Sequence, residues 1–290
     1  MPASSLAEAS FAYQRRWQTA RRVLPRPIRR ALRLGYFVAL DGIDLCLGRR
    51  QDLVPPRWLN PIGDGDYAST GAEFLDYFIR LGGLQPSHRV LDVGCGTGRM
   101  ARPLTKYLTT GSYEGFDIVP AGIRWCQKTI TPRFPNFHFT LADVRNPEYN
   151  RHGLVSAAEY RFPYRDAQFD FALLTSVFTH MRGPEVSRYL SELARVLAPG
   201  GRCLATFLVL NEQSRELIDS GRSSLVIRYP LEGCWASNLQ IPDPAIGYDE
   251  RDLGRLIGAA GLVLRSLHYG NWCGRADYLS YQDIAILEKA

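Results

Sequence analysis

The sequence predicts a three-layer α/β fold, in which helices cover both faces of a mostly parallel seven-stranded sheet. From residue 89 onward, short apolar strands alternate with amphipathic helices, and the first strand runs directly into a glycine-rich turn. Strands joined through helices in this way form a parallel sheet with two buried faces. The last two strands are separated by a short loop, so we expect them to pair as an antiparallel edge.

The strands of this sheet are short apolar runs, and most of them are followed by a helical pattern. The expected strands are 89–93, 112–118, 137–141, 169–175, 202–208, 262–268 and 282–287. The expected helices are 71–81, 103–108, 121–130, 185–197 and 252–260. These elements predict one domain over residues 71–290, with an insertion at about 209–248.

Residues 1–70 are expected to form a basic helical arm ahead of this domain. The whole chain carries a net charge of +6, whereas residues 1–60 hold eleven arginines, no lysine and four acidic residues, a balance of +7. The basic charge therefore belongs to the arm. We consider three interpretations of it: a lid on the domain, an interfacial helix that makes peripheral contact with an anionic membrane, or an RNA-binding tail. Asp41 and Asp44, within its apolar stretch, count against the membrane.

Composition excludes several other classes of protein. The six cysteines lie far apart and form no CxxC pair, which favours a reducing, cytoplasmic compartment over a disulfide framework or a zinc site. The N-terminus shows no uninterrupted apolar segment of the kind that a signal peptide needs. No recognised RNA-binding module accompanies the arm, so we do not expect a nucleic-acid partner.

The strongest local signal is the glycine-rich segment that follows the first strand, Asp92-Val93-Gly94-Cys95-Gly96-Thr97-Gly98. Glycines between a buried strand and a helix let the backbone approach a ligand closely. A dinucleotide-binding fingerprint would place its third glycine at position 99, which is Arg99. This departure argues against a nicotinamide dehydrogenase, the leading alternative. The carboxyl group of Asp92 suits a ligand that carries positive charge.

This loop, with the alternating strands after it, resembles the class I S-adenosylmethionine-dependent methyltransferases. The resemblance covers about residues 85–210 and, more loosely, the C-terminal strands. It implies a Rossmann-like fold and S-adenosyl-L-methionine as the cofactor. By this resemblance the loop Gly94–Gly98 would wrap the methionine and ribose portion, with Asp92 near the amino group. Asp117 matches the acceptor of the ribose hydroxyls, and Ile118 would pack on the adenine.

The resemblance extends to the next two strand ends. Asp143 and Val144 match the pair that reads adenine, through the carboxylate and the following backbone N–H. Thr175 and Ser176 end the fourth strand, where backbone carbonyls meet the methionine moiety. All of these positions fall at the carboxyl ends of successive strands, the edge at which open α/β sheets bind ligands.

The fourth strand also bears on the methyl acceptor. Methyltransferases of DNA and some other amine-methylating enzymes resemble one another in an Asn/Asp-Pro-Pro-aromatic sequence here, whereas this chain has Thr175-Ser176-Val177-Phe178. The nearest look-alike, Asn60-Pro61-Ile62, precedes the first core strand. We therefore expect transfer to an oxygen of a small molecule, such as a sugar, a lipid-linked saccharide or a secondary metabolite. N- or C-methylation, and a non-catalytic cofactor-binding subunit, are the alternatives.

Catalysis of methyl transfer depends mostly on alignment, aided by removal of the acceptor's proton. His180, just past the fourth strand, is our candidate general base, because imidazole can take a hydroxyl proton at neutral pH. His268 is a second candidate. No His/Asp/Glu cluster has metal-ligand spacing, so we expect no metal. The arm and the insertion 209–248 would cover the site or else complete the core or a dimer contact. The sequence predicts no oligomeric state.

Overall fold

The computed structural model divides the chain into two units, Met1–Asp64 and Gly65–Ala290. It describes residues 26–59, 66–241 and 244–290. The first 25 residues of the expected arm and the Asn60-Pro61-Ile62 segment lie outside the described residues. In the first unit, helix α2 (Arg26–Cys46) is followed by the short 3-10 helix η1 (Arg57–Leu59). The expected boundary after residue 70 remains a prediction.

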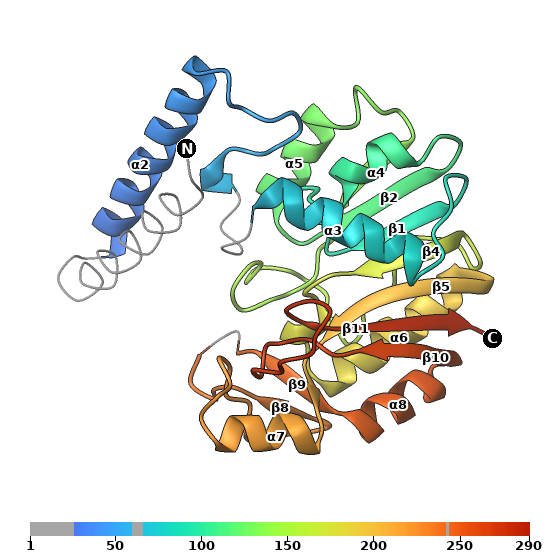
Figure 1. Ribbon diagram of the computed structural model, residues 1–290. Coiled ribbons are helices and arrows are strands. Elements are labelled where there is room, and N and C mark those ends of the chain that lie inside the picture. Colours follow the sequence, from blue (N-terminus) through green and yellow to red (C-terminus); the bar gives the residue numbers. More distant parts are fainter. Residues whose placement is uncertain (1–25, 60–65, 242–243) are drawn as a thin grey trace. The chain divides into compact units, whose positions relative to one another are not determined.

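The second unit is built on a seven-stranded sheet with the strand order β10-β11-β5-β4-β1-β2-β3 (Figure 1). Its strands are β1 (Arg89–Val93), β2 (Ser112–Asp117), β3 (Phe137–Leu141), β4 (Phe169–Leu174), β5 (Leu197–Phe207), β10 (Leu262–His268) and β11 (Asp283–Lys289). The pairs among β1 to β5 are parallel, whereas β11 pairs antiparallel with both β5 and β10. The expected fold class, a mostly parallel sheet with an antiparallel edge, is confirmed.

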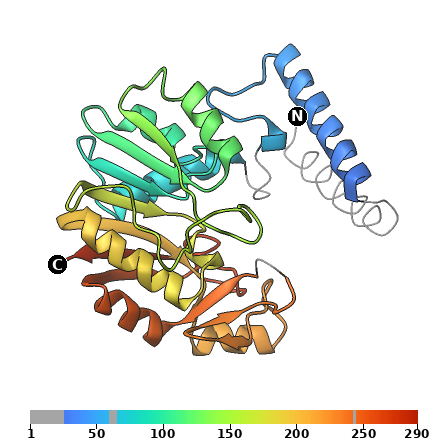
Figure 2. The same cartoon turned by 180° about the vertical axis from the view of Figure 1, so that it is seen from behind.

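Helices cover both faces of this sheet. They are α3 (Tyr67–Arg80), α4 (Ala101–Tyr107), α5 (Pro120–Thr129), α6 (Gly183–Val196) and α8 (Glu250–Ala259). Figure 1 shows α3 and α4 in front of the sheet, and Figure 2 shows α6 and α8 on its opposite face. Helix α6 illustrates why: its fully buried side chains recur every three or four residues and enter the main apolar core with those of α8.

Two elements begin four or five residues earlier than the sequence predicted. Helix α3 begins at Tyr67 and not at residue 71, because the Asp66 side chain accepts a hydrogen bond from the Ser69 N–H at 2.7 Å and caps the helix. Strand β5 begins at Leu197 and not at residue 202, since the intervening residues stay in the sheet as an irregularity in its pairing with β4.

The insertion holds a small sheet that the sequence did not predict. It contains β6 (Val209–Leu210), α7 (Glu212–Asp219), β7 (Tyr229–Leu231), β8 (Cys234–Ala236) and β9 (Ile246–Asp249). The four strands pair in the order β6-β9-β8-β7. A separate apolar core joins Leu217, Ile218 and Ile227 of the insertion to Trp272 and Cys273, which lie between β10 and β11. The insertion and the β10–β11 connection therefore pack as one body.

Among the helices in the described residues, none combines the length and the apolarity needed to cross a membrane.

Candidate active site

The glycine-rich loop joins β1 to α4 and turns at three glycines with positive φ angles. The φ angles of Gly94, Gly96 and Gly98 are 78°, 55° and 80°. A Cβ at Gly94 would lie 2.5 Å from the Cγ2 of Val177, so the loop can pack against the end of β4 only as glycine. A Cβ at Gly96 would meet no atom within 4 Å. The loop is therefore tightly packed at Gly94 and open at Gly96, where a ligand can approach the backbone.

Asp117, the last residue of β2, fixes the open part of this loop. Its Oδ2 accepts a hydrogen bond from the Gly96 N–H at 2.8 Å, and its Oδ1 accepts one from the Val119 N–H at 2.8 Å. Burial raises the pKa of Asp117, while the backbone donors of Val119, Gly96 and Ile118 act in the opposite direction. Each carboxylate oxygen has a further lone pair. The side chain is therefore oriented, with capacity left to accept ligand hydroxyls.

Asp92 lies in β1 and is completely buried. Its Oδ2 accepts a hydrogen bond from the Tyr113 hydroxyl at 2.6 Å, whereas its Oδ1 has no partner among the described residues. The pKa of Asp92 is raised to about 7, mainly by burial and in smaller part by the nearby Asp117 carboxylate, while the hydrogen bond from Tyr113 acts in the opposite direction. A buried carboxyl oxygen without a partner is costly, so this group is prepared for a proton or a cation.

The other expected cofactor residues lie at the ends of β2, β3 and β4. The Ala142 N–H donates to the Asp117 carbonyl at 2.9 Å, which joins the ends of β2 and β3. Asp143 follows and is exposed, whereas Val144 is buried. Ile118 is half-buried against the main core. Thr175 is half-buried at the end of β4. These positions share one edge of the sheet, and their expected contacts with the cofactor stay predictions.

Ser176 is a strained residue at the same edge. Its φ angle of 59° lies in the left-handed region, which non-glycine residues seldom adopt. Its N–H donates to the Thr206 Oγ1 at 2.8 Å, and its hydroxyl donates to the Gln282 Oε1 at 3.1 Å. The contact with Gln282 brings the start of β11 to the end of β4. This contact could not be expected from the sequence, because 106 residues separate the two side chains.

The two candidate bases lie on different elements. His180 ends the 3-10 helix η2 (Phe178–His180), four residues after Ser176, and is exposed. His268 ends β10, and its Nε2 lies 3.0 Å from the Ser266 hydroxyl. Exposure at the end of η2 leaves His180 accessible to an acceptor, and its catalytic role stays a prediction.

Several residues that support the loop were not predicted from the sequence. The buried Tyr67 donates its hydroxyl to the Thr97 carbonyl at 2.8 Å, which links α3 to the glycine loop. Tyr113 supports Asp92, and Thr206 supports Ser176. Each of these residues occurs in an expected strand or near a helix start, where an aromatic or β-branched side chain is ordinary. Residue type therefore gave no signal of their role.

A buried ion pair holds the connection between β10 and β11. Asp283 accepts hydrogen bonds from the Gly270 and Val209 N–H groups, the Trp272 Nε1 and, at 3.1 Å, the Arg275 Nη1. The Arg275 and Asp283 side chains are 2% and 0% exposed. Arg275 also donates to the side chains of Asn211 and Gln213, which belong to the insertion. The pair therefore fixes the connection and the insertion to each other.

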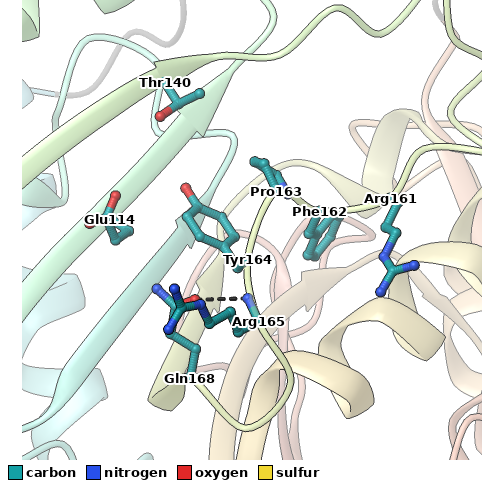
Figure 3. Close-up of a pocket in the computed structure, with 8 residues that line it drawn as sticks. All are labelled: Glu114, Thr140, Arg161, Phe162, Pro163, Tyr164, Arg165 and Gln168. Atoms are coloured by element: carbon teal, nitrogen blue, oxygen red, sulfur yellow. Dashed lines mark hydrogen bonds between the residues drawn. The ribbon is translucent and has the colours of Figure 1, made fainter.

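A cavity of about 680 Å³ lies elsewhere in this unit, beside β2 and β3 (Figure 3). Figure 3 shows the Tyr164 ring directed toward Glu114 and Thr140, with Arg165 and Gln168 below it. Burial raises the pKa of Glu114. None of the expected cofactor residues lines this cavity, so the candidate site at the glycine loop is separate from it.

The comparisons with known proteins agree with this geometry. The sequence model of the methyltransferase domain family matches residues 91–205, from β1 to β5. Residues 91–205 are a class I S-adenosylmethionine-dependent methyltransferase domain. A solved structure of a S-adenosylmethionine-dependent methyltransferase from Methanosarcina mazei has the same fold, with a TM-score of 0.50 at 21% identity, covering 73% of this chain and 96% of that one.

Curated relatives of this methyltransferase domain include proteins named for lipid substrates. A phthiotriol/phenolphthiotriol dimycocerosates methyltransferase from Mycobacterium ulcerans is 37% identical over 120 residues, 41% of this chain and 37% of that protein. A fatty-acid O-methyltransferase from Mycolicibacterium smegmatis is 31% identical over 118 residues, 41% of this chain and 36% of that protein. The aligned segment thus spans less than two fifths of each relative.

The site residues fit the cofactor of this methyltransferase domain, S-adenosylmethionine. The cofactor is a cation, and the Asp92 carboxyl oxygen that lacks a partner lies in the strand leading into the loop. Asp117 is oriented with lone pairs to spare, and the position above Gly96 is open. An acidic, open loop at the carboxyl ends of parallel strands matches the charge and the binding edge that this cofactor needs.

Proposed function

We propose that this protein transfers a methyl group from S-adenosylmethionine to an oxygen atom of a small molecule. The observation that carries this proposal is the oriented Asp117 carboxylate at the open side of the glycine loop, within a methyltransferase domain. The choice of oxygen is supported by the relative named as a fatty-acid O-methyltransferase and by the lack of an Asn/Asp-Pro-Pro motif after β4.

The residues of the chain have distinct tasks in this reaction. When bound, the cofactor supplies an electrophilic methyl group on a sulfonium sulfur. Asp117 accepts hydrogen bonds from the ribose hydroxyls, and Ile118, Asp143 and Val144 form the adenine site. His180 would take the proton of the acceptor hydroxyl, so that the oxygen can bond to the methyl group that the cofactor would supply. Alignment by the loop and by the end of β4 provides most of the acceleration.

We also propose the setting in which the reaction takes place. A hydroxylated or carboxylated lipid, a lipid-linked saccharide or a secondary metabolite is the acceptor. The protein works in a bacterial cytoplasm, without a nucleic-acid partner, and contacts the inner face of a membrane at its periphery. Mycobacterial relatives named for lipid substrates support this setting, as do six unpaired cysteines, of which five are buried.

The experiment has two stages. Isothermal titration with S-adenosylhomocysteine measures binding, and radiolabelled S-adenosylmethionine then tests transfer to fatty acids, long-chain diols and phenolic lipids. Label that alkali releases as methanol identifies a methyl ester, and label that resists alkali is assigned by mass spectrometry to an ether, an amine or a carbon. Binding without transfer to any acceptor would favour a non-catalytic subunit, and binding of NAD in place of the methyl donor would overturn the proposal.

A further inference from the structure

Helix α2 carries a broad apolar surface. At 100° per residue, an arc of roughly 200° around this helix contains no charged position. The large apolar side chains on this arc are all between 43% and 62% exposed: Ile28, Leu32, Leu34, Tyr36, Val38, Ile43 and Leu45. Folding normally buries such side chains, and an exposed apolar patch of this breadth marks an interaction surface.

The charged positions of α2 all fall on the remaining arc, namely Arg26, Arg29, Arg30, Arg33, Asp41 and Asp44. Both acidic residues pair with Arg57 within the first unit. The Arg57 guanidinium donates to the Asp41 Oδ1 at 2.8 Å and to the Asp44 Oδ2 at 2.5 Å, and the Arg57 N–H donates to the Asp41 Oδ2 at 3.0 Å. The two acids that interrupt the apolar stretch of the sequence therefore lie off the apolar arc, and Arg57 compensates one of their two negative charges.

The positive charge of residues 1–60 indicates which partner covers the apolar arc of α2. Residues 1–60 carry a balance of +7, and the exposed Arg49 and Arg50 directly follow the helix. A second copy of the chain would bring the same positive charge against this one, whereas an anionic lipid surface complements it. A helix with a wide apolar face and arginines along its polar face lies in the plane of a membrane interface.

We infer that α2 is an interfacial helix that docks the protein on an anionic lipid bilayer through Ile28, Leu32, Ile43 and their neighbours on the apolar arc. This inference deepens the proposed function, on which its choice of an inner membrane face rests. The helix axis lies parallel to the bilayer, its apolar arc enters the boundary between headgroups and acyl chains, and the positive charge of residues 1–60 attracts the anionic headgroups.

The chain contains a natural reporter for this docking. Cys46 lies near the middle of the apolar arc and is exposed, whereas the other five cysteines are buried. An environment-sensitive fluorophore on Cys46 of the full chain should shift its emission to the blue with mixed phosphatidylglycerol–phosphatidylcholine vesicles. Pure phosphatidylcholine vesicles should bind about tenfold more weakly, and added salt should weaken binding to the anionic ones. The same fluorophore on Leu154→Cys in a Cys46→Ser chain should stay unshifted.

Paired substitutions separate docking from folding. Leu32→Ser with Ile43→Ser should lower vesicle binding by roughly tenfold or more, because two apolar side chains are lost from the arc. Leu154→Ser with Leu239→Ser, at positions that are 81% and 59% exposed in the second unit, is the matched control and should leave binding unchanged. Circular dichroism and titration with S-adenosylhomocysteine on the same samples should be unaffected by either pair.

Three results would overturn the inference. They are an unshifted Cys46 reporter on anionic vesicles, equal vesicle binding by the Leu32/Ile43 variant and the wild type, and a dimer in sedimentation that this variant splits. The last result would show that a second copy covers the arc. Loss of S-adenosylhomocysteine binding with vesicle binding intact would contradict only the proposed function.

Discussion

Asp117 has two tasks that one side chain seldom combines. Its carboxylate holds the Gly96 and Val119 N–H groups, and it is also the expected partner of the ribose hydroxyls. The two backbone hydrogen bonds orient the carboxylate before any ligand binds. The side chain therefore loses little conformational entropy when it accepts hydrogen bonds from a ligand.

Replacing Asp117 with alanine should weaken binding of S-adenosylhomocysteine by about 1–3 kcal/mol, the usual effect of losing a charged hydrogen-bond partner. Isothermal titration measures the change. Asp117→Asn keeps an acceptor for one of the two backbone donors and should lose less affinity than Asp117→Ala. Unchanged affinity in the alanine variant would remove Asp117 from the cofactor site.

His180 is expected to act on the acceptor and not on the cofactor. His180→Ala should lower turnover by roughly 10²–10⁴-fold, the range for general-base catalysis, while the affinity for S-adenosylhomocysteine stays the same. Initial rates across pH, together with a binding titration, check both parts. Full activity at every pH would show that alignment alone suffices, and His268→Ala serves as the comparison variant.

Asp92 makes the stability of the fold depend on pH. Its pKa in the folded chain is about 7, above the ordinary value of 3.8. A carboxyl group whose pKa is raised by folding contributes stability that is fully present below about pH 4 and is lost as the pH rises to about 7. A pKa difference of about three units corresponds to at most about 4 kcal/mol.

Asp92→Asn should therefore become more stable relative to the wild type between pH 4 and pH 8. Urea unfolding of both proteins at several pH values measures the difference between their free energies of unfolding. The change of this difference with pH does not depend on any pH-independent effect of the asparagine amide on stability. Tyr113→Phe removes the hydrogen bond to the charged form and should extend the loss of stability to higher pH. A constant difference across this range would contradict the assignment of the raised pKa to Asp92.

At the scale of the element, prediction from sequence succeeded where a pattern was long and regular. Strands β1, β3 and β10 begin and end where expected, because apolar residues recur within each of them and a change of pattern marks both ends. The strands of the insertion were missed. Val209–Leu210 and Cys234–Ala236 are two and three residues long, too short for an alternating pattern to appear.

The geometry of the candidate site was predictable in part. Glycines, strand-end acids and their spacing placed Gly94–Gly98 and Asp117 together, as the contact between Gly96 and Asp117 shows. The partners across the sheet were not predictable. Tyr113 donates to Asp92 over 21 residues, and Gln282 accepts from Ser176 over 106, and neither distance along the chain follows from local pattern.

The connection between β10 and β11 depends on one ion pair. Arg275→Met should lower the free energy of unfolding by about 3–5 kcal/mol, because it leaves the Asp283 charge buried without its cation. The control is Arg255→Met, in an exposed pair with Asp252 whose side chains are 78% and 50% exposed, which should cost less than about 1 kcal/mol. Urea unfolding compares the two. Equal losses of unfolding free energy in the two variants would show that the buried pair stabilises the fold no more than an exposed pair does.

At the scale of the whole molecule, the unequal distribution of charge has a structural counterpart. The unit Met1–Asp64 carries the basic charge and the apolar arc of α2, whereas Gly65–Ala290 carries the cofactor loop and the acids around it. A high isoelectric point calculated for the entire chain therefore describes the first unit and not the second. Binding of lipid and binding of cofactor are expected to respond to different substitutions, and the variants above test them separately.

The position of β11 sets the order in which the sheet can be completed. This strand is the last of the seven along the chain, yet it lies between β5 and β10. When the chain leaves the ribosome, β10 emerges first and has no neighbour in the sheet until β11 follows. Until β11 is in place, the backbone donors and acceptors of β10 are unpaired. The apolar side chains at the edge of β5 are also exposed until then. We therefore expect β10 and β11 to join the edge of β5 together as an antiparallel pair, in the step that completes the sheet.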